Sequence, residues 1–329
     1  MKFIKYSIAL IICFALSVPA MAQRSTRSQG EVPPPKTKKA AQEQTVPHRS
    51  KKRSPQNTGV VAGQIRPRVF LNPGHGGHDS DDRPCPFYNE GMQARVEYYE
   101  SDSNLKGAMA MKDILRSRGY EVFMSRVNNT TDDDLNLFEI HQLALNSGAD
   151  VFFAIHSNSS GSATRRVNFP FAIYRGYDGG GTAEGSEELA GIVASNLADC
   201  EATSWSRGGL THGDWSFYRN RSGLGVFRWN KLPGILVENC FHDYQIERER
   251  LLNKDYCGLL ATINSRSLDK FFNRPAQQFG MVAGIVRYDY PRKGKRLTSF
   301  GKDAYQPLNG VPVELCDLEG NPIQTYQID

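Results

Sequence analysis

Between residues 68 and 272, short apolar segments alternate with longer segments in which apolar residues recur at helical spacing. The short segments have the length and composition of buried strands and lie at 68–72, 120–124, 150–155, 169–174 and 233–238. Helical spacing is found at 102–118, 186–199 and 246–272. A further helix is predicted to begin with a cap at 132–134 and to run to residue 146. Strands that alternate with helices form a parallel sheet covered on both faces. The predicted fold is therefore α/β, with a mostly parallel twisted sheet and helices on both faces.

The N-terminal residues 1–22 have the three parts of a secretory signal peptide. Lys2 and Lys5 form the charged start, residues 8–18 are apolar, and the small residues of 20–22 predict cleavage before Gln23. The apolar stretch is too short to span a membrane comfortably. We therefore expect an exported chain, in the periplasm or outside the cell, with no integral membrane segment after the signal is removed.

Residues 23–66 are rich in Pro, Lys, Arg, Gln and Ser and almost lack large apolar residues, which predicts a disordered linker. The formal net charge of +5 belongs to this end of the chain. Residues 1–58 hold eleven Lys or Arg and two Glu, which leaves 29 of the 40 basic and 33 of the 35 acidic residues for the rest. A basic domain that binds nucleic acid is therefore not expected.

The pattern changes again beyond the last predicted helix. Residues 279–329 contain strand-like alternation at 281–286 and 311–315, separated by Gly, Pro and Asn turn residues. This predicts a short all-β segment of antiparallel strands. A β-sandwich usually needs about 100 residues, so the segment is expected to be a partial, sandwich-like module.

Three predicted strands end in residues that can carry chemistry. Residues 72–79 read NPGHGGHD after the first strand, His156 ends the strand at 150–155, and Glu238 ends the strand at 233–238. Ligands of open parallel sheets bind at the carboxyl ends of the strands. Catalytic zinc prefers three ligands of the His and Glu type with one open position. On this pattern His75 and His156 are the candidate imidazoles, and His78 is a rival. His48, His141, His212 and His242 lack such a context and are expected to be structural or surface residues.

Four short motifs occur in a fixed order along 68–272. They are NPGHGGHD at 72–79, ESDSNL at 100–105, AIHSN at 154–158 and PGILVE at 233–238. In this order they resemble the motifs of the zinc-dependent N-acetylmuramoyl-L-alanine amidases, which cut peptidoglycan. The resemblance implies a catalytic domain at 67–274 that hydrolyses the amide between N-acetylmuramic acid and L-alanine.

The resemblance also implies roles for individual residues. His75, Glu100 and His156 would hold Zn²⁺, and Glu238 would be the catalytic carboxylate that moves a proton from water to the leaving amine. By composition alone Glu90 and Glu97 compete with Glu100, and only the resemblance selects among the three. Two positions depart from the family pattern: Asn72 stands where Asp is more usual, and Cys240 stands where a small residue is more usual.

Some features leave alternatives open. The segment 205–229 is rich in Trp, Tyr and Arg and is either a groove wall for sugars and peptide carboxylates or a loop packed on its own aromatic residues. Five cysteines follow the predicted signal peptide, and the sequence does not select a pairing among Cys85, Cys200, Cys240 and Cys257. The alternatives in function are a zinc peptidase that acts on another amide and an inactive wall-binding module. The partner that the resemblance implies is the peptidoglycan substrate, and the sequence does not identify a regulator protein.

Overall fold

The computed structural model describes residues 66–79, 84–89, 94–161, 167–200, 202–203, 210–277, 286–291, 305–307 and 310–327. The predicted signal peptide and all but the last residue of the predicted linker lie outside these ranges. Among the helices within them, none is long and apolar enough to cross a membrane.

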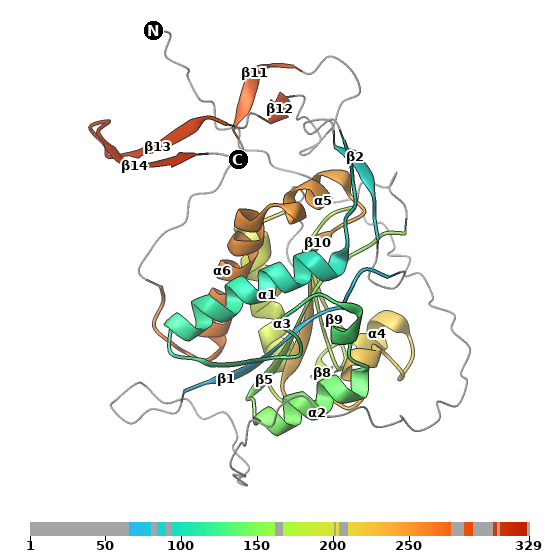
Figure 1. Ribbon diagram of the computed structural model, residues 1–329. Coiled ribbons are helices and arrows are strands. Elements are labelled where there is room, and N and C mark those ends of the chain that lie inside the picture. The colour runs from blue at the N-terminus through green and yellow to red at the C-terminus, as the bar shows by residue number, and fades with distance from the viewer. Residues whose placement is uncertain are drawn as a thin grey trace.

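A six-stranded sheet forms the centre of the α/β domain (Figure 1). Its strands lie in the order β4 (Glu121–Met124), β1 (Arg68–Pro73), β5 (Val151–Asn158), β10 (Gly234–Phe241), β6 (Phe171–Tyr174) and β9 (Leu210–Gly213). Neighbouring strands are parallel except for β10 and β6, which are antiparallel. The predicted mostly parallel sheet is confirmed.

Helices cover both faces of this sheet, as predicted (Figure 1). The helices α1 (Glu100–Ser117), α3 (Ser186–Asp199) and α6 (Lys254–Phe271) pack on one face, and α2 (Leu137–Ser147) and α4 (Asp214–Tyr218) lie on the other. Successive residues of a strand point to opposite faces, so Phe152 and Phe153 of β5 belong to different cores although both are fully buried. Burial on both faces explains why the central strands are continuous apolar runs.

The helix predicted over 246–272 is wrong in one respect, because the chain forms two helices there. The first, α5 (Gln245–Leu252), ends at Asn253, whose backbone is extended, and α6 begins after it. The Asn253 side chain accepts hydrogen bonds from the backbone nitrogens of Asp255 and Tyr256, at 2.7 and 3.1 Å. Asn253 is therefore the N-cap of α6. The sequence pattern did not reveal the break, because a polar residue at this position is also compatible with one continuous helix.

The predicted cap of the second helix is also wrong. Residues Thr131–Asp133 form a short 3-10 turn, and α2 begins only after Asn136. The Asn136 side chain accepts from the backbone nitrogens of Phe138 and Glu139, and Glu139 bonds back to the Asn136 backbone. This reciprocal pair is a capping box, and it fixes the start of the helix.

The described part of the C-terminal segment consists of antiparallel strands, as predicted. The strands β11 (Arg287–Pro291) and β12 (Tyr305–Pro307) form one pair, and β13 (Pro312–Cys316) and β14 (Pro322–Gln327) form a hairpin. Most hairpin residues are exposed, and the hairpin lies apart from the helices in Figure 1. The division of the chain into domains stays a prediction. The remaining short elements are β2 (Phe87–Asn89), β3 (Ala94–Val96), β7 (Gly176–Tyr177), β8 (Gly180–Gly181) and the 3-10 turn η2 (Gly225–Phe227).

We predict that Asn253→Ala lowers the free energy of unfolding by about 1 kcal/mol, because two backbone donors of α6 lose their acceptor. For a domain of this size the melting temperature should fall by about 2–4 °C. Asn253→Asp retains the acceptor and is the matched control, expected to melt near the unsubstituted protein. Equal loss in both variants, measured by circular dichroism, would contradict the capping role.

Candidate metal centre

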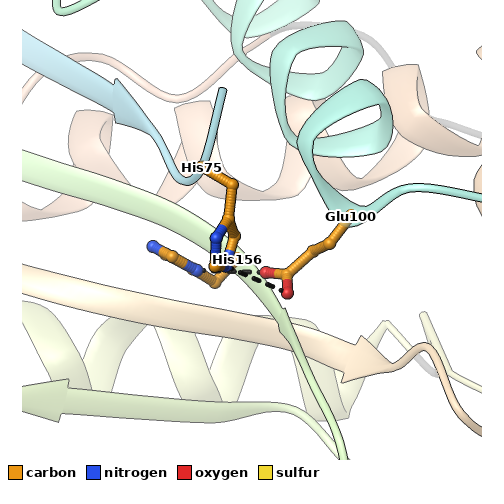
Figure 2. A group of neighbouring side chains, drawn as sticks. All are labelled: His75, Glu100 and His156. Atoms are coloured by element: carbon orange, nitrogen blue, oxygen red, sulfur yellow. Dashed lines mark hydrogen bonds and ion pairs between the residues drawn. The ribbon is translucent and has the colours of Figure 1, made fainter. Parts of the chain in front are cut away.

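Three of the predicted site residues meet at the carboxyl edge of the sheet (Figure 2). His75 lies in the loop after β1, Glu100 is the first residue of α1, and His156 lies in β5. One nitrogen or oxygen atom from each lies within 4.8 Å of the others. The Nε2 atom of His75 is 3.3 Å from Oε2 of Glu100, and Nδ1 of His156 is 3.0 Å from Oε1.

The loop that carries His75 is shaped by the glycine before it. The Gly74 nitrogen donates to the Ile155 carbonyl at 3.0 Å, so the loop passes directly over β5. A Cβ atom at Gly74 would lie 2.0 Å from Cε1 of His156. Any residue other than glycine at this position would therefore clash with the imidazole. His75 itself has a φ of 62°, the left-handed conformation that non-glycine residues rarely adopt. The approach of the two imidazoles therefore depends on the backbone of this loop.

Glu100 is almost fully buried, with 2% of its surface exposed. Its Oε1 atom accepts from the backbone nitrogen of Ser157 at 3.0 Å and from the amide of Asn104 at 3.1 Å. Burial opposes ionisation of the carboxyl, but the charge of His75 and the hydrogen bonds from His156 and His75 hold its pKa well below the usual range. The carboxyl is therefore ionised at neutral pH and available as a ligand.

The donor set and its spacing fit a zinc ion. Two ligand atoms that are both 2.0–2.1 Å from a tetrahedral ion lie about 3.3–3.4 Å apart. The separation of 3.3 Å between Nε2 of His75 and Oε2 of Glu100 has this value, and Nδ1 of His156 lies 3.0 Å from the other carboxylate oxygen, Oε1. Two imidazoles and one carboxylate are also a ligand set that catalytic zinc uses, with a fourth position left open.

Glu238 lies beside this group on the neighbouring strand. It is in register with His156, because β10 and β5 are parallel neighbours. Leu236 and Ala154 are likewise in register and belong to the same core cluster, and residues two apart on a strand share a face, so Glu238 and His156 point to the same side of the sheet. Tyr218 lies in α4, and burial, followed by the charges of Glu238 and Asp214, raises the pKa of its hydroxyl to about 12. The Tyr218 hydroxyl is therefore close enough to Glu238 to feel its charge.

His78 and Glu97, two of the rival ligands named from the sequence, lie outside the group of three. The Nε2 atom of His78 donates to the Asp102 carboxylate at 2.9 Å, and its ring stacks on Tyr99, outside the group of three. Glu97 is exposed and pairs with Arg95, and Glu90 lies outside the described residues. His141 is buried against the Val226 carbonyl, and His212 pairs with Asp178, while His48 is in the part of the chain that the structure does not describe.

His242 lies beside the group of three without belonging to it. It is buried, with Nδ1 3.8 Å from Oε2 of Glu100, which agrees with the expectation of a structural residue. The same nitrogen donates to the Ser157 carbonyl at 2.9 Å. Burial lowers its pKa, so the imidazole is neutral.

Both residues that depart from the family pattern are buried. The side-chain oxygen of Asn72 accepts from the Ser125 hydroxyl at 2.8 Å, which ties β1 to the residue after β4. Cys240 is fully buried in the core. All five cysteines of the predicted mature chain lie in the described part and carry free thiols, so the structure selects no disulfide pairing.

The aromatic segment over 205–229 is described from residue 210 onward. Trp215 packs edge-on to Tyr177 at 5.1 Å, and the guanidinium groups of Arg175 and Arg221 lie 5.0 and 5.9 Å from its ring. In the described part of this segment, Trp215 therefore packs against protein side chains, namely one tyrosine and two arginines. The role of a groove wall stays a prediction.

The fold and the site together define an α/β domain with three side chains of the metal-ligating type at the carboxyl edge of its sheet. The sequence model of the N-acetylmuramoyl-L-alanine amidases matches residues 69–269, and the chain belongs to this family. The chain is therefore an enzyme that hydrolyses the amide between N-acetylmuramic acid and L-alanine in peptidoglycan. This confirms the function implied by the four sequence motifs.

Individual relatives agree with this assignment. The chain is 28% identical over 207 residues to the sporulation-specific N-acetylmuramoyl-L-alanine amidase of Bacillus subtilis (strain 168), covering 63% of this chain and 68% of that protein. It is 25% identical over 209 residues to the N-acetylmuramoyl-L-alanine amidase CwlM of Bacillus licheniformis, covering 63% and 69%. The fold is similar to that of the amidase AmiC2 of Nostoc punctiforme, with a TM-score of 0.50, 22% identity and coverage of 64% of this chain and 100% of that chain.

We predict that Gly74→Ala lowers zinc affinity by at least about tenfold, because the new methyl group displaces the His156 ring. Gly191→Ala in α3 is the control, since a Cβ atom there meets nothing within 4 Å and should stabilise the helix by about 0.5–1 kcal/mol. Zinc affinity is measured by competition with a chromogenic chelator. An unchanged affinity in a folded Gly74→Ala protein would refute the close approach of loop and ring.

Proposed function

We propose that this amidase depends on a zinc ion held by His75, Glu100 and His156. The observation that carries the proposal is the convergence of one donor atom from each residue within 4.8 Å. When bound at such a site, zinc supplies Lewis-acid activation of the attacking water and of the scissile carbonyl. Glu100 contributes the negative charge of the ligand set, and the hydrogen bonds from Ser157 and Asn104 hold its carboxylate in place.

Glu238 is the proposed proton carrier. A carboxylate that is not a ligand can accept a proton from the attacking water and donate it to the leaving amine. Its register with His156 and its direction on the same face of the sheet support this role. His75 and His156 would hold the metal ion and Glu238 would carry the proton, so ligation and proton transfer reside on different residues.

We also propose that the chain acts outside the cytoplasm. Peptidoglycan lies in the cell envelope, and the features of residues 1–22 support export by a signal peptide. The basic, proline-rich composition of 23–66 supports a linker between the cleavage site and the catalytic domain at 67–274.

We expect Glu238→Gln to retain zinc and to lose about 100- to 10,000-fold in turnover, because the amide side chain cannot carry the proton. His156→Ala should lose both zinc and activity. The measurements are metal content and mass spectrometry of a peptidoglycan digest, which identifies the bond that is cut. Normal turnover in Glu238→Gln would refute the assigned role.

The same assay distinguishes the alternative functions. Cleavage of peptides without release of unsubstituted stem peptides from N-acetylmuramic acid would indicate a zinc peptidase. Zinc binding without cleavage of any substrate would indicate a wall-binding module.

We predict that removal of residues 279–329 leaves hydrolysis of soluble wall fragments unchanged, because all four proposed catalytic and ligand residues precede this segment. The cut falls after the contacts that close α6, including the bond from Arg118 to the Pro275 carbonyl and that from Gln277 to Asp269. Rates for the truncated and full chains are compared on soluble fragments. A truncated protein that folds and binds zinc but does not cleave them would show that the segment is needed for catalysis.

A further inference from the structure

A buried arginine joins the two segments that carry the first two proposed ligands. Arg126 follows β4, and only 5% of its surface is exposed. Its Nη2 atom donates to the Gly74 carbonyl at 3.1 Å and to the Ser101 carbonyl at 2.8 Å. Gly74 immediately precedes His75, and Ser101 immediately follows Glu100. One guanidinium nitrogen therefore links the backbone beside one proposed ligand to the backbone beside the other.

The rest of the guanidinium extends this connection. Its Nε atom donates to the Pro73 carbonyl at 3.2 Å, and Nη1 donates to the side-chain oxygen of Asn129 at 3.0 Å. That oxygen also accepts from the Gly77 nitrogen at 2.9 Å, and the Asn129 amide donates to the Ser101 hydroxyl at 3.1 Å. The loop around His75 is thus held on both sides, before the ligand by Arg126 and after it by Asn129.

This support acts on a strained position. His75 has a φ of 62°, a left-handed conformation that a non-glycine residue adopts only at a cost in free energy. Such a conformation persists only where its surroundings fix it. The hydrogen bonds to Pro73, Gly74 and Gly77 fix the backbone on both sides of the strained residue.

We propose that Arg126 is a positioning residue of the metal centre, whose guanidinium sets the separation between His75 and Glu100. This inference rests on the proposed zinc site. Lysine cannot replace it, because an ammonium group presents its donors from one atom, whereas the planar guanidinium reaches carbonyls and an amide oxygen in three directions. The function of Arg126 is therefore geometric, and it acts on the ligands through the backbone.

The test compares Arg126→Lys with Arg248→Lys in the full chain. Arg248 is an equally buried arginine, 5% exposed, that bonds Cys85 and covers the Phe87 ring, and it contacts none of the proposed ligands. Zinc affinity is measured by chelator competition, ligand geometry by the visible absorption of the cobalt-substituted protein, and folding by the melting temperature of the metal-free protein.

We expect Arg126→Lys to weaken zinc binding by about 10- to 100-fold and to change the cobalt spectrum. Arg248→Lys should leave zinc affinity and the cobalt spectrum unchanged, even where it lowers the melting temperature. Equal zinc affinity and spectrum in folded Arg126→Lys and in the unsubstituted protein would overturn the inference and leave Arg126 a residue of stability only. If Arg126→Lys does not fold, Asn129→Ala is measured in the same way, because it removes the second support of the loop and should also weaken binding. An unsubstituted protein that binds no zinc would instead refute the proposed zinc site, so the two failures are distinguishable.

Discussion

A buried carboxylate is stable only when its charge is paired and its oxygens accept hydrogen bonds, and Glu100 imposes this requirement on the whole site. Its partners come from three segments that are distant in the sequence: His75 after β1, His156 and Ser157 in β5, and Asn104 one turn further along α1. Each partner is in place only if β1, β5 and α1 meet at the carboxyl edge of the sheet. The same contact that satisfies the buried charge therefore brings the proposed ligands together.

The sheet makes this meeting possible through its parallel register. Pro73 pairs with Ile155 and Glu238 pairs with His156, so the ends of β1, β5 and β10 lie at the same edge. The apolar rows beneath them, such as Phe152 and Leu236, fix that register, because a slip of one residue would exchange the two faces of the strand. The hydrophobic core thus determines which polar side chains become neighbours above it.

The parts of the structure that depend on local pattern could be predicted from the sequence, and those that depend on distant contacts could not. Strands β1, β5 and β10 were predictable because burial on both faces gives continuous apolar runs. Glu100 was identified only through family resemblance, since nothing local distinguishes it from Glu97. The break at Asn253 was missed because Asn occurs both inside helices and at their caps. The contacts of His242 and Arg126 could not be predicted because their partners, Ser157 and Gly74, are far away in the sequence.

The two ends of α1 have different surroundings: the C-terminal end is fixed to α6, and the N-terminal end carries Glu100. At its C-terminal end, Asp269 of α6 accepts from the Tyr120 hydroxyl at 3.0 Å and pairs with Arg118 at 2.6 Å, which joins α6 to the turn between α1 and β4. At its N-terminal end lies Glu100, about 25 Å away along an 18-residue helix. The contacts of Asp269 hold the C-terminal end of α1 against α6. At the N-terminal end, Glu100 lies within 4.8 Å of donor atoms of His75 and His156, which is the spacing that the proposed metal site requires. Helix α1 can present Glu100 there because its far end is fixed.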